Sequence, residues 1–445
     1  MINNLLKKYM ESRPDDTFIH YNNNDITYEN MVYALEGRIK SLQALNIKEG
    51  ALVGLYLDKS LDLIEVLFAC IEIKVTPLII PHQSTKDEIK KLCNLVKFDY
   101  FITSWNKTDN LKNNNVPTFP IQELSPSIGG CAPSIQNELN DTQIACLLLT
   151  SGTTGVPKIV PLSIKNILES CKAWHERISY KTHDIYLNCL PLHHIGGLSI
   201  IFRSLLYGFK VVLVDKFKND DCIEQIIKHR ISLISLVPTM LARIIQSKKI
   251  RILHQHLRAV ILGGAYCKST LIKEAIKHNI NLYKSYGMTE SCSGISGFWV
   301  NNHLEYIESS GTAHNGVEFK IENDQILIKG STVIKEYYNQ SPILGWYNTN
   351  DVGHVNKDGF LYVLGRRNQI ITGGENIDSS EIEDIITEHP NVNKVFINSI
   401  DDDEWGQKII AYIDSNNLDK KTLKKWLNTK LTNHKIPKEF IFIKH

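Results

Sequence analysis

The chain has 445 residues, of which 43% are hydrophobic and 22% are charged, and its formal net charge is +2. At roughly 100–200 residues per domain, this length predicts more than one folded unit. A net charge this close to zero provides no general attraction for nucleic acid or a membrane surface, so the sequence predicts neither partner.

The start of the chain and the cysteines predict a cytoplasmic protein. Residues 1–15 lack an apolar core of the secretory type, so no signal peptide is expected. No stretch reaches the ~18 uninterrupted apolar residues of a membrane span. The nine cysteines are scattered singly without a CxxC pair, which argues against disulfides and a structural zinc site and suits a reducing compartment.

The first hundred residues alternate strand and helix patterns. Apolar runs at Ala51–Leu57 and Thr76–Ile80 predict buried strands, and Leu61–Ile73 and Thr85–Val96 predict helices between them. Such alternation favours a parallel sheet with helices on its faces. Residues 104–141 are polar and rich in Asn, Pro, Ser and Gly, so we expect a long irregular connection there.

The middle of the chain continues the α/β pattern. Residues 317–328 and 360–364 alternate apolar and polar side chains, as half-exposed strands do. Buried strands separated by helical segments are predicted at residues 144–150, 185–190, 211–214, 233–237, 259–262 and 281–286.

The end of the chain predicts a second, smaller unit. Residues 381–445 contain two helix patterns and strand candidates at Val395–Ile400 and Lys408–Ile413, which indicate a small α+β domain. We place the boundary near Arg366. The predicted fold class is therefore α/β, with a large multi-sheet domain over residues 1–365 and a small α+β domain over residues 366–445.

One string after an apolar strand indicates phosphate binding. Its hydroxyl residues and glycines expose backbone N–H groups and hydroxyl donors, which suit phosphate oxygens. It is not a P-loop, because Lys158 follows Pro157 and precedes Ile159. The string reads Thr150-Ser151-Gly152-Thr153-Thr154-Gly155-Val156-Pro157-Lys158.

Three further strings complete a nucleotide-binding pattern, although each alone is typical of a structural turn. In residues 285–290, Thr289 could bond a phosphate and Glu290 could hold the Mg²⁺ of a nucleotide, since hard cations select oxygen ligands. Residues 345–351 place Asp351 in a turn, where its carboxylate could bind two ribose hydroxyls. Residues 365–369 and 373–377 bring a basic pair and a glycine turn to the domain boundary.

With these motifs in this order, the chain resembles the acyl-adenylate-forming superfamily, which includes acyl- and aryl-CoA ligases, amino-acid adenylation domains and luciferases. The resemblance spans nearly the whole chain. Within the superfamily it is most similar to the o-succinylbenzoate–CoA ligases of menaquinone synthesis. The segments that carry this finer similarity are Leu190–Ser199, Ile234–Pro238, Leu262–Ala265 and Ser285–Ser291.

The resemblance implies a two-step ligase that uses ATP, Mg²⁺ and coenzyme A. An aromatic carboxylate would attack the α-phosphorus of ATP to give acyl-AMP, and the coenzyme A thiol would then displace AMP. Positioning and charge neutralisation would dominate the catalysis. By resemblance, the ATP site takes in Thr150, Ser151, Gly152, Thr153, Thr154, Gly155, Lys158, Gly263, Gly264, Ala265, Ser285, Tyr286, Gly287, Met288, Asp351 and Arg366, and the residues implied in catalysis are His194, Thr289 and Glu290, with Glu290 as the metal ligand.

The same resemblance suggests two residues of the acyl pocket. His194 occupies the family's aromatic/His position on the pocket floor, with a packed histidine as the alternative, and His193 is assigned no role. Arg203 is a candidate counter-charge for a second substrate carboxylate, although an arginine on an apolar helix more often extends to solvent. The sequence also leaves a homo-oligomer open.

Other readings of the sequence remain. An amino-acid-activating domain is disfavoured, because residues 190–199 contain no Asp to pair with a substrate ammonium. Fatty acids stay open as substrates, as does a non-catalytic nucleotide-binding relative. The small domain is expected to take two orientations about a hinge at Asn368 and Gln369. Relatives carry a catalytic lysine beyond the segment Lys435–Lys438, whereas this chain stops at His445, so we expect an incomplete end and poor adenylation.

Overall fold

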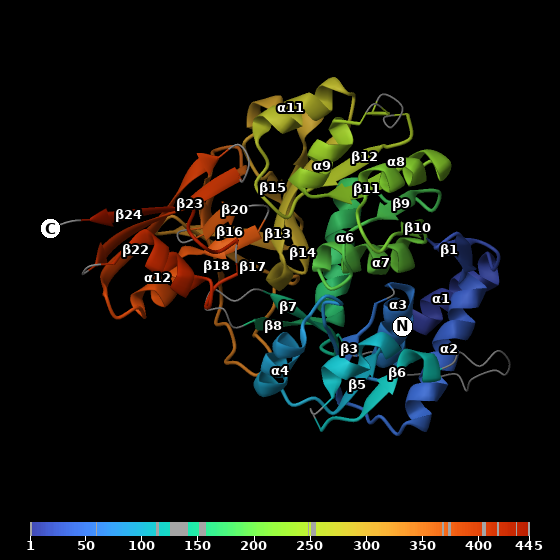
Figure 1. The fold of residues 1–445 in the computed structure, drawn as a ribbon. Coiled ribbons are helices and arrows are strands. Elements are labelled where there is room, and N and C mark those ends of the chain that lie inside the picture. Colours follow the sequence, from blue (N-terminus) through green and yellow to red (C-terminus); the bar gives the residue numbers. More distant parts are fainter. Residues whose placement is uncertain are drawn as a thin grey trace.

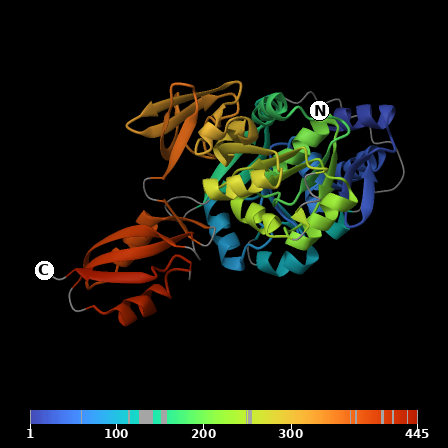
Figure 2. The ribbon, with the colours of Figure 1, turned by 90° about the horizontal axis from the view of Figure 1, so that it is seen from above.

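The computed structural model contains a large α/β body, a four-stranded sheet beside it and a second lobe at the C-terminal end (Figure 1). Figure 2 shows this lobe as a separate mass next to the body. The structure describes residues 2–58, 60–112, 115–124, 141–150, 157–247, 249–250, 255–366, 369–372, 375–402, 406–415, 418–432 and 434–443.

A six-stranded sheet forms one half of the body, in the order β6-β5-β3-β4-β7-β8. Its neighbours are parallel except for β8, which runs antiparallel to β7. Every residue of β3 is buried, as expected for a strand covered on both faces. The elements are β3 (Leu52–Tyr56), α3 (Ser60–Glu72), β4 (Thr76–Ile79), α4 (Lys86–Leu95), β5 (Tyr100–Thr103), η1 (Trp105–Lys107), α5 (Thr108–Leu111), β6 (Thr118–Pro120), η2 (Ile121–Glu123), β7 (Ile144–Thr150) and β8 (Lys158–Ser163).

A nine-stranded sheet forms the other half, in the order β15-β14-β13-β12-β11-β9-β10-β1-β2. Its centre, from β13 to β1, is parallel, and antiparallel strands close both edges. The elements are α1 (Ile2–Ser12), β1 (Thr17–Tyr21), β2 (Asn24–Thr27), α2 (Tyr28–Ala44), α6 (Ile164–Ile178), β9 (Ile185–Asn188), α7 (Ile195–Tyr207), β10 (Lys210–Leu213), α8 (Asn219–Lys228), β11 (Leu233–Leu236), α9 (Pro238–Ile245), β12 (Ala259–Leu262), α11 (Ser269–Lys277), β13 (Leu282–Met288), η3 (Thr289–Ser291), β14 (Ser293–Trp299), η4 (Val300–Asn302), η5 (Leu304–Tyr306) and β15 (Thr312–Ala313).

The two sheets and their helices form five layers. The largest apolar core packs α1, α2, α3, α6 and α7 between the sheets. Helices α8, α9 and α11 cover the outer face of the nine-stranded sheet, and α4 and α5 cover that of the six-stranded sheet. Burial on both faces explains the continuous apolar runs of the sequence.

Two smaller sheets follow the body. Antiparallel strands form the first, in the order β16-β17-β18-β19, and the second has the order β21-β20-β23-β22 with β24 beside β23. Helices α12 and α13 pack on the second sheet around an apolar core of their own. The elements are β16 (Val317–Glu322), β17 (Gln325–Gly330), β18 (Tyr347–Val355), β19 (Leu361–Arg366), β20 (Gln369–Thr372), β21 (Glu375–Asp378), α12 (Ser379–Thr387), β22 (Val392–Asp402), β23 (Gly406–Ser415), α13 (Lys420–Leu427) and β24 (Glu439–Ile443).

The predicted fold class is confirmed, and the strands and helices named from the sequence are present with shifts of a few residues at their ends. Two expectations need correction. The described part of residues 104–141 contains short elements, among them α5 and β6, rather than only loop. The described residues of the small domain form five strands and not only the two expected, because short segments such as Glu439–Ile443 become strands only by pairing with β23. No helix of the described residues is long and apolar enough to cross a membrane.

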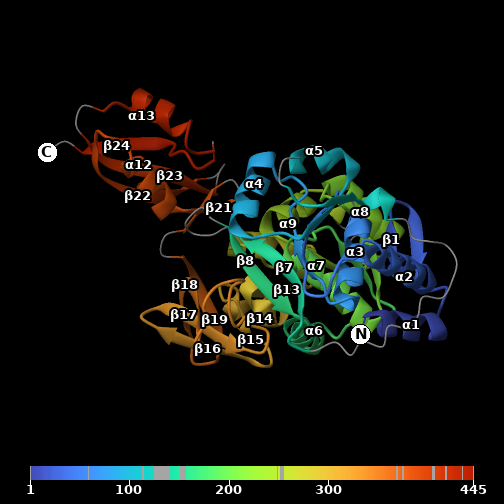
Figure 3. The same ribbon diagram turned by 90° about the horizontal axis from the view of Figure 1, so that it is seen from below.

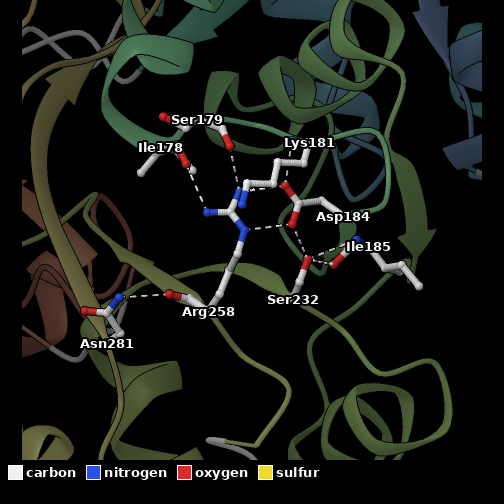
Figure 4. Close-up of polar contacts among 8 residues, drawn as sticks. All are labelled: Ile178, Ser179, Lys181, Asp184, Ile185, Ser232, Arg258 and Asn281. Atoms are coloured by element: carbon white, nitrogen blue, oxygen red, sulfur yellow. Dashed lines mark hydrogen bonds and ion pairs between the residues drawn. The ribbon is translucent and has the colours of Figure 1, made fainter.

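A buried ion pair joins the amino ends of four neighbouring parallel strands (Figure 4). Arg258 donates to both carboxylate oxygens of Asp184, at 2.7 and 2.6 Å, and Ser232 Oγ donates to the same carboxylate at 2.8 Å. Asn281 Nδ2 donates to the Arg258 carbonyl at 2.9 Å. Asp184 directly precedes β9, Ser232 precedes β11, Arg258 precedes β12 and Asn281 precedes β13, so the network fixes the relative heights of these strands.

Removal of the Asp184 carboxylate should destabilise the protein. Breaking a buried pair typically costs 3–5 kcal/mol, and because the Arg258 side chain is 30% exposed we expect about 2–3 kcal/mol for Asp184→Ala. Urea denaturation measures this difference. The exposed pair of Glu274 and Lys277 offers a control, since Glu274→Ala should leave the denaturation midpoint unchanged.

The difference in the free energy of unfolding between the wild type and Asp184→Ala should depend on pH. Burial opposes ionisation of Asp184, but hydrogen bonds from Arg258, the Lys181 N–H and Ser232 outweigh it and lower its pKa. A lowered folded-state pKa gives stability above the unfolded carboxyl pKa, and this stability is lost as the pH falls through the folded value. The gap between the wild type and Asp184→Ala should therefore shrink on acidification below pH 4, and a constant gap would contradict the assignment.

Candidate functional site

The carboxyl ends of β12 and β13 bring two of the predicted strings together. The strands are parallel neighbours, with Leu262 paired to Lys284. A Cβ atom on Gly263 would lie 3.0 Å from the Ser285 carbonyl oxygen, so the start of segment 263–265 runs beside the start of segment 285–290. Ligands of open α/β sheets bind at this end of the strands. The structure thus groups Gly263, Gly264 and Ala265 with Ser285, Tyr286, Gly287, Met288, Thr289 and Glu290.

A close strand approach makes Gly287 necessary. A Cβ atom there would lie 2.1 Å from the Ser293 carbonyl oxygen on β14, so no other residue fits without movement. The strand register shifts between Tyr286 and Gly287, and such bulges re-aim side chains at the rim of a sheet. Thr289 and Glu290 then follow in the 3-10 turn η3, where both are partly exposed.

Asp351 lies inside strand β18 and not in a turn, which corrects the expectation from the sequence. The residue before it, Asn350, supplies the turn-like backbone with φ 61°. Asp351 is only 6% exposed, and Tyr286 Oη donates to its Oδ2 atom at 2.5 Å. Its partner across the β18–β19 ladder is Arg366, so the two predicted ribose residues lie opposite each other on adjacent strands.

Two tyrosines complete the surroundings of Glu290, and the sequence did not single them out for a role. Tyr337 Oη donates to Glu290 Oε1 at 3.0 Å and lies 2.8 Å from Tyr347 Oη. The Nζ atom of Lys158 lies 4.9 Å from the centre of the Tyr337 ring. Tyr337 therefore contacts residues of three different predicted strings. Tyr337 lies outside the helices and strands, in a segment with no helix or strand pattern. Only the three-dimensional positions of the neighbouring strands could have pointed to its contacts.

The donor set around Glu290 fits a magnesium ion. Glu290 is partly exposed, and its Oε2 atom has no polar partner among the described residues. In the described part of the chain, no group of three or more His, Cys, Asp or Glu residues could hold a metal. Mg²⁺ is commonly held by one or two carboxylates together with substrate phosphates, and such a site needs no larger protein cluster.

The two histidines before α7 are placed differently from the expectation, in which His194 lies on the floor of the acyl pocket and His193 has no role. His194 is exposed at the N-cap of the helix, whereas His193 is 7% exposed and lines a cavity of about 270 Å³ together with His82. Burial and the neighbouring imidazoles of His194 and His82 lower the pKa of His193 to about 3. His193 is therefore neutral near pH 7. Gly197 permits this geometry, because a Cβ atom there would lie 2.5 Å from the Leu190 carbonyl oxygen.

Arg203 is buried and does not reach solvent. It is 2% exposed, its Nη2 atom donates to Ser293 Oγ at 3.0 Å, and its Cζ atom lies 4.3 Å from the Trp174 ring centre. Its Nε atom has no hydrogen-bond partner, and no described carboxylate pairs with it. Burying a guanidinium without a counter-charge costs several kcal/mol.

Some predicted residues lie outside the described part of the chain. These are Ser151, Gly152, Thr153, Thr154 and Gly155 of the phosphate string, and Arg367, Asn368, Gly373 and Gly374 near the domain boundary. The two ends of the phosphate string are described. Thr150 ends β7, Lys158 begins β8, and the two residues pair with each other in the antiparallel ladder. Figure 3 shows β7, β8 and β13 close together on the side of the body that faces the C-terminal lobe.

Comparison with known proteins agrees with the family resemblance that the sequence motifs indicated. The family described as AMP-binding enzyme matches residues 6–338, and the AMP-binding enzyme C-terminal domain matches residues 381–445. The 2-succinylbenzoate–CoA ligase of Lactococcus lactis is 32% identical over 98% of this chain and 95% of its own length.

The o-succinylbenzoate CoA synthetase (MenE) of Bacillus subtilis is similar in structure. A double mutant bound to the product analogue OSB-NCoA has a TM-score of 0.84 at 27% identity, covering 99% of this chain and 95% of its own. The same protein has a TM-score of 0.77 in complex with OSB-AMP and also with ATP and a magnesium ion, at 28% identity, 99% coverage of this chain and 94–95% of its own. The resemblance inferred from the motifs is confirmed, and the chain belongs to the AMP-binding enzyme family.

Proposed function

We propose that the chain is an ATP-dependent acid–thiol ligase that converts 2-succinylbenzoate to 2-succinylbenzoyl-CoA through an acyl-AMP intermediate, a step of menaquinone biosynthesis. The observation that carries this proposal is full-length similarity to ligases of that name, joined to a site in which the predicted nucleotide-binding strings meet. ATP, Mg²⁺ and coenzyme A are the cofactors and co-substrates that this reaction requires.

The nucleotide would lie across the carboxyl ends of β12 and β13 and beside Asp351 in β18. Asp351 would accept the ribose hydroxyls, with Arg366 opposite it on β19. Segments 263–265 and 285–288 would border the adenine, and the string 150–158 would surround the phosphates. The support for this arrangement is the pairing of β12 with β13, the hydrogen bond from Tyr286 to Asp351 and the contact of Lys158 with Tyr337.

Glu290 would hold Mg²⁺, with the Thr289 hydroxyl directed to phosphate. The ion supplies charge neutralisation to the phosphates when bound. The protein's own part is to align the carboxylate of the substrate with the α-phosphorus and to place Lys158 near the departing phosphates. Neither role needs covalent chemistry from the protein, which agrees with a site built from hydroxyl, carboxylate and ammonium groups.

Arg203 supports an acid with a second carboxylate. 2-Succinylbenzoate carries two carboxylates, of which only one is activated, and the other needs a counter-charge in a desolvated pocket. Arg203 is buried and unpaired among the described carboxylates, and it lies on α7 directly after the segment that contains His194. We propose that it binds the carboxylate that does not react.

The small domain would begin at residue 366 and rotate as a unit. Sheet β16–β19 ends at Arg366, sheet β20–β24 begins at Gln369, and the latter has its own core. The higher TM-score against the complex with OSB-NCoA than against that with ATP favours an orientation suited to the thiol step. We further propose a cytoplasmic location, since the eight described cysteines are free thiols and the reaction consumes ATP and coenzyme A.

The proposed activity predicts ATP–pyrophosphate exchange that depends on the acid. In a panel of carboxylic acids, 2-succinylbenzoate should support the fastest exchange, and addition of coenzyme A should yield the thioester. Faster exchange with a long fatty acid would reassign the substrate. Absence of ATP binding in calorimetry would overturn the ligase assignment altogether.

Asp351→Asn should weaken ATP binding by about 1.5–3 kcal/mol, because it removes the charge that strengthens two ribose hydrogen bonds. The amide keeps an acceptor for Tyr286, so the buried site should still fold. Tyr286→Phe is the comparison, since it removes the internal hydrogen bond that Asp351→Asn keeps and leaves the carboxylate. Calorimetry with ATP distinguishes the two, and equal affinities of Asp351→Asn and wild type would restrict Asp351 to a structural role.

Arg203→Met should lower kcat/KM for 2-succinylbenzoate by about two orders of magnitude, within the 2–5 kcal/mol range for a desolvated charge pair that loses one partner. An analogue with a single carboxylate should not be affected, because it has no group for Arg203 to bind. A methionine of similar volume replaces an unpaired buried charge, so the urea midpoint should be unchanged or higher. Equal losses for both acids would contradict the assignment.

A further inference from the structure

We propose that Tyr337 is a positioning residue that orients the Glu290 carboxylate toward Mg²⁺ and so couples metal binding to nucleotide binding. This inference rests on the proposed function, in which Glu290 holds the ion. It goes beyond that function because Tyr337 belongs to none of the nucleotide-binding strings and would act through another residue.

The hydroxyl proton of Tyr337 is donated to Glu290. The carboxylate of Glu290 can only accept a hydrogen bond, so in the 3.0 Å contact Tyr337 is the donor. In the 2.8 Å contact between the two phenols, Tyr347 must then donate to Tyr337. The hydrogen bonds therefore run in one direction, from Tyr347 through Tyr337 to Glu290 Oε1.

The hydrogen bonds from Tyr347 to Tyr337 and from Tyr337 to Glu290 restrain the Glu290 side chain. A glutamate on a short 3-10 turn that is partly exposed has several rotamers, and ordering it costs up to about 2 kcal/mol. The Tyr337 hydroxyl holds Oε1 and leaves Oε2 for another ligand. Outer partners of metal-binding carboxylates act in this way, and their removal typically lowers metal affinity 10–100-fold.

Tyr337 contacts two charged groups, the Glu290 carboxylate and the Lys158 ammonium. The backbone places it firmly, because the Tyr338 N–H donates to the Ile159 carbonyl on β8 and the Ile334 N–H donates to the Glu290 carbonyl. Its ring also lies under the Lys158 ammonium at 4.9 Å. One side chain thus contacts both the proposed metal ligand and the proposed phosphate ligand. Through these two contacts Tyr337 would link metal binding to nucleotide binding.

The variant Tyr337→Phe tests the proposal, because it removes the hydroxyl and keeps the ring beneath Lys158. Calorimetry measures the affinity for α,β-methylene-ATP once in EDTA and once in Mg²⁺. The ratio of the two affinities is the gain that the metal gives. We expect this gain to fall about tenfold in Tyr337→Phe, while the affinity in EDTA is unchanged. Tyr338→Phe is the matched control, since this adjacent tyrosine makes no contact with Glu290 among the described residues, and it should behave as wild type.

A second readout separates positioning from a general structural effect. Transfer from synthetic acyl-AMP to coenzyme A requires no metal in the proposed mechanism, so Tyr337→Phe should perform it at the wild-type rate. A loss in this step as large as the loss in Mg²⁺-dependent binding would overturn the positioning role. A full Mg²⁺ gain in Tyr337→Phe would overturn it as well. If the wild type itself shows no Mg²⁺ gain, the assignment of Glu290 fails first, which distinguishes failure of the proposed function from failure of this inference.

Discussion

The Asp184–Arg258 pair fixes the amino ends of four parallel strands, and the position of the site follows from that constraint. Asp184, Ser232, Arg258 and Asn281 each stand one residue before a strand, and their hydrogen bonds hold the strands at defined relative heights. Strands β9, β11 and β12 have four residues each and end together, and the longer β13 continues past them. The segments after β9 and β12 and the last part of β13 are therefore brought to one edge of the sheet by contacts at its opposite edge.

Each of the two acidic residues of the site accepts a hydrogen bond from a tyrosine hydroxyl. Asp351 accepts a hydrogen bond from Tyr286, and Glu290 accepts one from Tyr337. A lysine or arginine in the same place would neutralise the carboxylate and compete with a metal ion or a ribose hydroxyl. A phenol orients the carboxylate while leaving its charge and its second oxygen available. At Glu290, the tyrosine would thus preserve the capacity of the carboxylate to bind a ligand.

The sequence was sufficient for the fold class and for the strings that meet at the site, because buried parallel strands and glycine turns leave local signals. Asp351 and Glu290 stand inside such strings. Tyr337 does not, since its role depends on a contact with β13–η3 that no local pattern records. The orientation of the adjacent histidines could not be predicted from the sequence either. Which of His193 and His194 turns inward is decided by packing around Gly197 and not by residue type.

A net charge of +2 on 445 residues means that anionic substrates meet no general positive field, so each negative group must meet its own local partner. Lys158 and Glu290 with its metal would serve the phosphates, and Arg203 would serve the unreacted carboxylate. Because Arg203 is buried, its charge is poorly screened by salt and destabilises the empty protein. An acid that lacks the second carboxylate leaves this cost uncompensated, whereas a dicarboxylate removes it. The unfavourable burial of one arginine would thereby favour an acid with two carboxylates over an acid with one.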